Sequence, residues 1–132
     1  ENASAAKHFR EAIRLDPDYA EAYNYLGYMF AEDGVRLDEA LELTGRAVAL
    51  EPESGAFLDS LGWVLFKKGM TNEALTHIEK ALKAEPEDPV IRDHLGDIYF
   101  KKGLREKARE EWNRSLKFDP GQEKVKEKLK GR

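Results

Sequence analysis

Cysteine is absent from all 132 residues, which excludes disulfide bonds and thiolate chemistry. Long apolar runs are absent too; the longest span only a few residues, as at 63–66, so the sequence holds no transmembrane or signal segment. A positive charge balance is also missing, because the formal net charge is -4, whereas nucleic-acid binders usually carry a basic face. We therefore expect neither membrane contact by this segment nor nucleic-acid binding.

What is present indicates a folded chain. Hydrophobic residues make up 41% and charged residues 36% of the sequence, which is too apolar for a disordered chain. The first residue is Glu1 rather than methionine, so we expect a piece of a longer protein that continues towards its N-terminus. The composition leaves the compartment open between cytoplasm and bacterial periplasm or cell envelope.

Prolines recur at a fixed interval after an acidic residue. Pro52, Pro86 and Pro120 are 34 residues apart, and Pro17 lies 35 residues before Pro52. Leu-Gly pairs recur in step with them at residues 26–27, 61–62 and 95–96. A period of this length is the signature of a helical repeat array.

Each repeat reads as two helices. The first ends at a glycine (Gly34, Gly69 or Gly103), the usual terminator just past a helix, and the second ends before the proline. The mid-helix glycines Gly27, Gly62 and Gly96 are expected to face the alanines of the second helices (Ala40, Ala74 and Ala108), where the two helices approach closely. The expected units are a truncated second helix at 1–17, repeats at 18–52, 53–86 and 87–120, and a capping helix at 121–132.

The motif at these positions is specific. Tyr23-x2-Leu26-Gly27-x2-Phe30 and its two later counterparts, with Ala74-x3-Ile78-x2-Ala81 up to Pro86, resemble the tetratricopeptide (TPR) repeat over nearly the whole chain. The resemblance implies an all-α TPR solenoid, a right-handed superhelix of antiparallel helix pairs. It also implies a protein-binding scaffold or adaptor rather than an enzyme. The residues at 25–28 and 59–63 are more distinctive than a generic TPR motif, and they resemble TPR lipoproteins of the bacterial cell envelope.

Two local features depart from a regular array. The first repeat has one extra residue between Gly34 and Ala40, which predicts a longer turn with Asp38 capping the second helix. The ends differ as well: residues 122–130 predict a lysine-rich capping helix, whereas Ala5, Phe9, Ala12 and Ile13 form an apolar face with no upstream partner. Self-association through that uncapped helix is therefore expected.

No catalytic constellation is found. The histidines His8, His77 and His94 do not pair at metal-ligand spacing, and the serines lie in no nucleophile context, so we expect no catalytic residue, metal or cofactor. His8 and His77 read as surface residues, and His94 as a solvated residue or a partner contact.

Helical periodicity instead predicts a binding stripe on the concave side of the first helices. Its predicted protein-binding residues are Asn24, Tyr28, Asp59, Trp63, Asp93, His94 and Asp97. The acids have no basic residue on the stripe, so they favour a partner segment with lysine or arginine beside apolar residues. The alternative to a binding role is that Trp63 packs between repeats and the acids only confer solubility. Gripping of a chaperone's C-terminal carboxylate is excluded, because the matching stations hold no basic residue.

Three functions remain open. The first is an adaptor that recruits a partner peptide or helix. The second is an architectural or self-assembly segment, and the third is an accessory TPR domain of a larger enzyme. The identity of the partner cannot be read from these residues.

Overall fold

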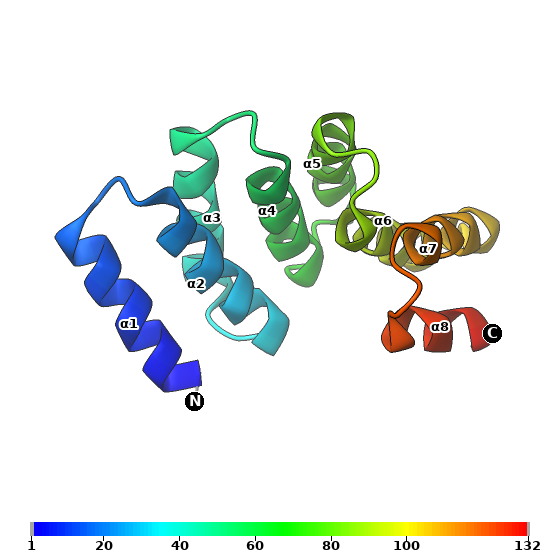
Figure 1. The fold of residues 1–132 in the computed structure, drawn as a ribbon, viewed down its shortest axis with the longest axis horizontal. Helices are drawn as coiled ribbons and strands as arrows, with labels where there is room; N and C mark the ends of the chain where they lie inside the picture. The colour runs from blue at the N-terminus through cyan, green and yellow to red at the C-terminus, as the bar shows by residue number, and fades with distance from the viewer. Residues whose placement is uncertain (1, 132) are drawn as a thin grey trace.

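The computed structural model describes residues 2–131, which form eight helices and no strand. The helices are α1 (Asn2–Leu15), α2 (Ala20–Asp33), α3 (Leu37–Leu50), α4 (Gly55–Lys67), α5 (Thr71–Ala84), α6 (Pro89–Lys101), α7 (Arg105–Phe118) and α8 (Glu123–Lys130). Figure 1 shows them following one another along a curved row, with α1 and α8 at its two ends. The predicted all-α solenoid is confirmed.

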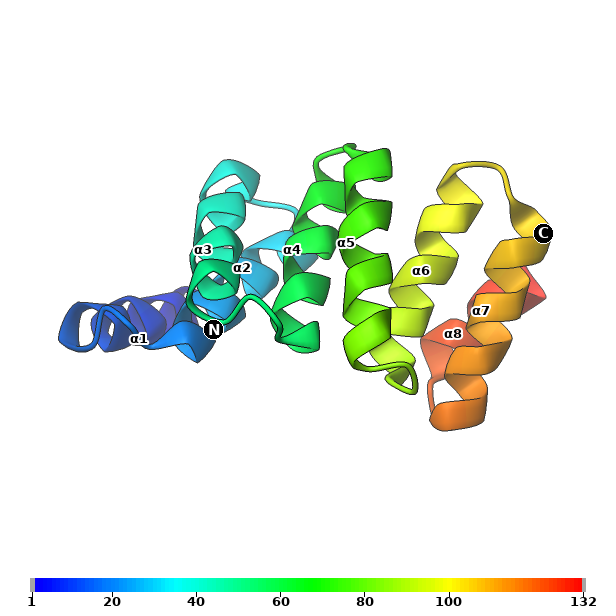
Figure 2. The same ribbon diagram turned by 90° about the horizontal axis from the view of Figure 1, so that it is seen from above.

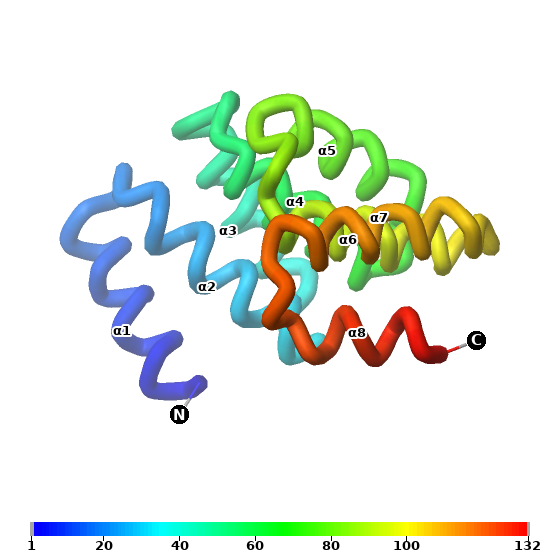
Figure 3. Tube along the Cα trace, turned by 45° about the vertical axis from the view of Figure 1, so that its right-hand side comes forward, coloured from blue at the N-terminus to red at the C-terminus, as the bar shows by residue number. Residues whose placement is uncertain are grey.

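The row is built from antiparallel helix pairs. The most extensive packing joins α2 to α3, α4 to α5 and α6 to α7. Figure 2 shows the members of these pairs lying side by side along the row, and Figure 3 shows α8 folded back beside the last pair. Each pair falls within one of the repeats expected from the sequence, because the connections between pairs contain the acidic-proline junctions.

Local signals set the helix ends. Gly69 and Gly103 take positive φ angles of 87° and 82°, the left-handed conformation that glycine adopts without a steric cost. Asp88 caps α6, since its carboxylate accepts hydrogen bonds from the backbone N–H groups of Val90 and Ile91, and Pro89 occupies the first turn. Glycine thus marks the turn within a pair, whereas the aspartate cap and proline mark the start of the last pair.

The mid-helix glycines lie where the paired helices touch. A Cβ on Gly27 would lie 2.7 Å from Cγ2 of Thr44, and one on Gly62 would lie 2.8 Å from Cδ1 of Ile78. A Cβ on Gly96 would overlap the indole of Trp112. The predicted close approach is confirmed, but the side chain that fills the space above each glycine lies four residues after the predicted alanine.

The longer turn predicted for the first repeat is not found, because residues 34–36 connect α2 to α3 just as 68–70 and 102–104 connect the later pairs. Helix α2 has 14 residues, against 13 in α4 and α6, and thus takes up the extra residue. Asp38 also does not cap α3. Helix α3 begins at Leu37, so Asp38 lies inside its first turn and pairs with Lys68 instead. The residue before the helix is Arg36, which has a φ of 50° and forms no side-chain cap. The capping prediction was wrong because α3 begins one residue before Asp38, while the extra residue of the repeat lengthens α2.

The two ends of the row are packed differently. In α8, Val125 is buried against Ala108 and Trp112. In α1 no residue is buried; Phe9 and Ile13 pack partly against α2, while Ala5 and Ala12 stay partly exposed. Helix α2 therefore covers part of the predicted face, and Ala5 and Ala12 are the members of it that stay partly exposed without packing on the α2 cluster.

Candidate protein-binding surface

Three first helices, α2, α4 and α6, share one face of the solenoid, here called the inner face. A shallow depression of about 290 Å³ lies on it and is lined from all three helices and the cap of α6. The lining residues are Asn24, Tyr28, Ala56, Asp59, Ser60, Asp88, Val90 and Ile91. The structure thus brings three of the predicted binding residues, Asn24, Tyr28 and Asp59, to one place.

Asn24 and Tyr28 supply the α2 side of the depression. Asn24 is 7% exposed, and its side-chain oxygen Oδ1 is buried without a hydrogen-bond partner among the described residues. An unpaired buried carbonyl is costly, and such a group in a native structure points to a missing partner. Tyr28 is half-buried; burial and then the nearby charge of Glu32 raise the pKa of its hydroxyl, so the phenol stays neutral.

Asp59 and His94 form a buried pair between the second and third repeats. Nδ1 of His94 lies 2.8 Å from Oδ1 of Asp59, and both side chains are almost completely buried. Burial alone lowers the pKa of His94, but the charge of Asp59 and the hydrogen bond to it, together with Asp93 and Asp97, outweigh burial and raise it. His94 is therefore a buried link between repeats, hydrogen-bonded to Asp59, and the prediction of a solvated residue was wrong.

Trp63 lies in the same joint. Its ring stacks on His94 with centroids 3.9 Å apart and on Phe66 at 5.2 Å, and Nε1 donates to Oε2 of Glu32 at 2.8 Å. Only 6% of Trp63 is exposed. The indole is packed between repeats, as the alternative interpretation held, so it offers little surface to a partner.

Asp93 and Asp97 are not free on the stripe. Nζ of Lys128 in α8 lies 2.8 Å from Oδ1 of Asp93 and 2.9 Å from Oδ1 of Asp97. Burial, with the neighbouring Asp93, nevertheless raises the pKa of Asp97 despite the lysine. No lysine or arginine of the stripe itself pairs with these two acids. Their basic partner comes from outside the stripe, because α8 takes the position of a next first helix and brings Lys128 to α6.

The predicted binding residues did not include four residues of this surface: Glu32, Ser60, Val90 and Lys128. A signal for Lys128 was available, since Lys128 follows Asp93 by 35 residues, the same separation as between Asp59 and His94. Val90 is 45% exposed, an apolar side chain left open on the inner face. No sequence signal distinguishes Glu32 from the other acids at helix ends.

Neither a metal site nor a membrane span is found in the part of the chain that the structure describes. Within residues 2–131, no group of three or more histidine or acidic side chains is arranged to hold a metal ion. None of the described helices has the length and apolar character needed to cross a membrane.

Comparison with known proteins agrees with this geometry. One family model described as "TPR repeat" matches residues 1–34, and one described as "Tetratricopeptide repeat" matches residues 65–131. A TPR repeat-containing protein of Pseudomonas aeruginosa, PA4667, is 40% identical over 72 residues, which is 54% of this chain and 12% of that protein. The chain therefore spans only about an eighth of that relative's length.

Solved structures resemble the fold over most of the chain. The crystal structure of MamA has a TM-score of 0.74 at 20% identity, covering 94% of this chain and 72% of that one. TTC0263, a thermophilic TPR protein of Thermus thermophilus, has a TM-score of 0.81 at 19% identity, covering 94% of this chain and 69% of that one. At this identity the likeness establishes the fold alone.

The fold and its repeated contacts define a helical-repeat solenoid of the kind used for protein–protein interaction. The chain belongs to the tetratricopeptide repeat family. That family and its fold are typical of scaffolds that bind other proteins or peptides and are not themselves catalytic.

Proposed function

We propose that this chain is an adaptor whose inner face binds an extended or helical segment of a partner protein. The observation that carries the proposal is the depression shared by α2, α4 and α6, which combines an open apolar residue with a buried carbonyl that lacks a partner. Such a site takes a segment that supplies a hydrogen-bond donor beside an apolar side chain.

The charge of the depression favours a basic residue in that segment. Asp59 and Asp88 are its charged lining residues, and no lysine or arginine lines it. Lys128 pairs with Asp93 and Asp97, and His94 pairs with Asp59, so the preference rests mainly on Asp88, which has no ion pair among residues 2–131. Acidic fields of this kind speed the association of basic segments and fade as salt is added.

Capture of partners from a lysate of the source organism, followed by binding measurements with the purified partner, tests this function. Tyr28→Ala and Val90→Ala should each weaken binding by about 1 kcal/mol or more, which is a several-fold loss of affinity. Tyr19→Ala is the matched control, because Tyr19 is a 43% exposed aromatic residue outside the depression. Equal binding by all three variants would contradict the proposal.

Trp63 separates binding from packing. Because its indole is buried between repeats, Trp63→Ala should lower the free energy of unfolding by about 3–5 kcal/mol. A fully folded Trp63→Ala variant of unchanged stability that had lost partner binding would restore the original interpretation of this residue as a contact.

A second candidate function is self-assembly, favoured by the face of α1. Ala5 and Ala12 are partly exposed, whereas Ala40 and Ala47, at the same register of α3, are 0% exposed. A second copy that covers this face would bury the apolar surface that α2 leaves open. The third possibility, an accessory domain of a larger enzyme, draws no support from any group within residues 2–131.

A further inference from the structure

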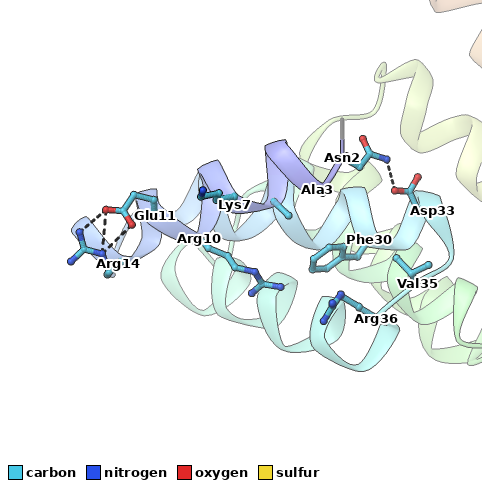
Figure 4. Close-up of a pocket in the computed structure, with 11 residues that line it drawn as sticks. Asn2, Ala3, Lys7, Arg10, Glu11, Arg14, Phe30, Asp33, Val35 and Arg36 are labelled. Carbon is cyan, nitrogen blue, oxygen red and sulfur yellow. Dashed lines mark hydrogen bonds and ion pairs between the residues drawn. The ribbon is translucent and has the colours of Figure 1, made fainter.

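A second cleft lies away from the inner face, at the N-terminal end of the row. It has a volume of about 590 Å³ and is bounded by α1, the end of α2 and the turn that leads to α3. Figure 4 shows Arg10 of α1 and Arg36 of the turn coming together beside Phe30. None of the predicted inner-face residues lines this cleft.

Two features of the sequence open the cleft. Ala6 stands where Leu41 and Leu75 stand in the next second helices, and those leucines pack against the core, whereas alanine is too short to fill the space. Arg36, the residue before α3, takes a φ of 50°. A left-handed conformation is unfavourable for a residue other than glycine, asparagine or aspartate, and strain of this kind clusters at functional sites.

The rim of the cleft is basic in a chain of net negative charge. Its lining contains four cations, Lys7, Arg10, Arg14 and Arg36, against two acids, Glu11 and Asp33. The floor is apolar, formed by Ala3, Ala6, Phe30 and Val35, and Val35 is 47% exposed.

Not all of these cations are satisfied within the chain. Arg10 is held by Glu39 at 2.6 Å and Arg14 by Glu11 at 2.5 Å. Arg36 approaches Glu39 only to 3.7 Å, and Lys7 has no ion pair within residues 2–131. The guanidinium groups of Arg10 and Arg36 both lie over the Phe30 ring, at 5.6 and 5.8 Å, which holds them at the mouth of the cleft.

We propose that this cleft binds an acidic peptide segment that places a carboxylate between Lys7 and Arg36 and an apolar side chain on Val35 and Ala6. Guanidinium and ammonium groups form strong charge-assisted hydrogen bonds with carboxylates, and the apolar floor adds burial that a free anion cannot use. The site is a second docking surface, separate from the inner face and opposite to it in charge preference.

A titration with two short capped peptides tests the proposal. The probe is acetyl-Leu-Glu-Leu-Glu-amide, and the control is the same peptide with glutamine in place of glutamate. In an ¹H–¹⁵N spectrum of the whole chain, the acidic peptide should shift the amide signals of Ala3, Ala6 and Val35, and the shifts should shrink as salt is added. Equal binding of the two peptides, shifts confined to the inner face, or no saturable shift at millimolar peptide would overturn the proposal.

Arg36→Gly distinguishes a binding role from a structural one. Glycine adopts the left-handed conformation freely, so the variant should keep or raise its thermal midpoint. Its affinity for the acidic peptide should nevertheless fall about tenfold, the loss expected for one charge-assisted contact. Arg46→Ala is the matched control, since Arg46 is a surface arginine of α3 outside the cleft. Unchanged affinity in Arg36→Gly would show that the arginine serves only the turn.

Discussion

The terminal helices at the two ends of this solenoid differ in how much of their surface is buried. At the C-terminal end, Val125 of α8 is buried, and Lys128 contacts Asp93, which lies 35 residues earlier in the sequence. His94 contacts Asp59 at the same sequence separation between α4 and α6. At the N-terminal end, α1 has no buried residue. Neighbouring first helices are thus linked by a polar contact that recurs along the row. This contact is present between α4 and α6 and between α6 and α8.

The joint between α2 and α4 lies between these extremes. Asn24 stands at the register of Asp59 and Asp93, but its side-chain oxygen has no partner, and Ser60 stands nearby where the next repeats have histidine and lysine. A partner that supplies a hydrogen-bond donor would gain the most binding free energy where this contact is missing, at the unpaired oxygen of Asn24. The depression on the inner face includes this incomplete joint.

The largest expected effect in this comparison concerns helix packing near the C-terminal end, where α8 covers the last helix pair. Gly96→Leu should lower the free energy of unfolding by about 3 kcal/mol or more, because the indole of Trp112 occupies the space above Gly96. Gly62→Leu should behave similarly against Ile78. Urea unfolding of each variant measures the loss.

Gly45 provides the matched control for these substitutions. It also lies within a helix, but a Cβ placed there has no neighbour within 4 Å. Gly45→Ala should therefore raise stability by about 0.5–1 kcal/mol through helix propensity alone. If Gly96→Leu were as well tolerated as Gly45→Ala, the helices of the last pair would not touch at that point.

The second effect concerns the charged joint. His94→Gln keeps a hydrogen-bond donor but removes the charge that Asp59 stabilises, so it should cost about 2 kcal/mol near pH 6. The folded-state pKa of His94 is raised, so its stabilising contribution is fully present below the unfolded pKa of about 6.5 and is lost as pH rises through the folded value. The difference between wild type and variant should therefore shrink towards pH 9. A difference that grew with pH would show that His94 is neutral in the folded chain.

A smaller loss of stability is expected when Lys128 of the C-terminal helix α8 is replaced. Lys128→Met leaves Asp93 and Asp97 without their cation and should cost about 1–2 kcal/mol. Lys126→Met removes a solvent-facing pair with Glu123 and should cost less than about 0.5 kcal/mol. Thermal unfolding of the two variants side by side gives the contrast; equal midpoints would place Lys128 among ordinary surface charges.

Much of the fold follows from the sequence, because its determinants are local. Glycine at a turn and a Leu-Gly pair at a fixed period are local signals, so Gly69 and Gly62 were interpreted correctly. The exception is Asp38, which lies inside α3, two residues after the capping position at Arg36.

The candidate site was harder to predict, because it depends on which residues of different repeats meet. Periodicity placed Asn24, Tyr28 and Asp59 on one face, and they do line one depression. It could not show that Trp63 and His94 would stack on each other and become buried, since that depends on how closely α4 and α6 approach. It also treated α8 as a solubilising cap, so the reach of Lys128 to Asp97 was not foreseen.

The smallest expected effect on folding concerns the open end, and it shows whether that end is a surface for assembly. Ala5→Glu places a charge on the partly exposed face of α1 without removing Phe9, which packs against α2. The stability of the monomer should change by less than about 0.5 kcal/mol, because the position is not buried. If copies associate through this face, sedimentation of the wild type should show dimers that grow with concentration, and Ala5→Glu should weaken them about tenfold, or roughly 1.4 kcal/mol. Ser4→Glu adds the same charge at a neighbouring exposed position and should leave the dimers intact. A wild-type chain that stayed monomeric at high concentration would contradict self-assembly through α1.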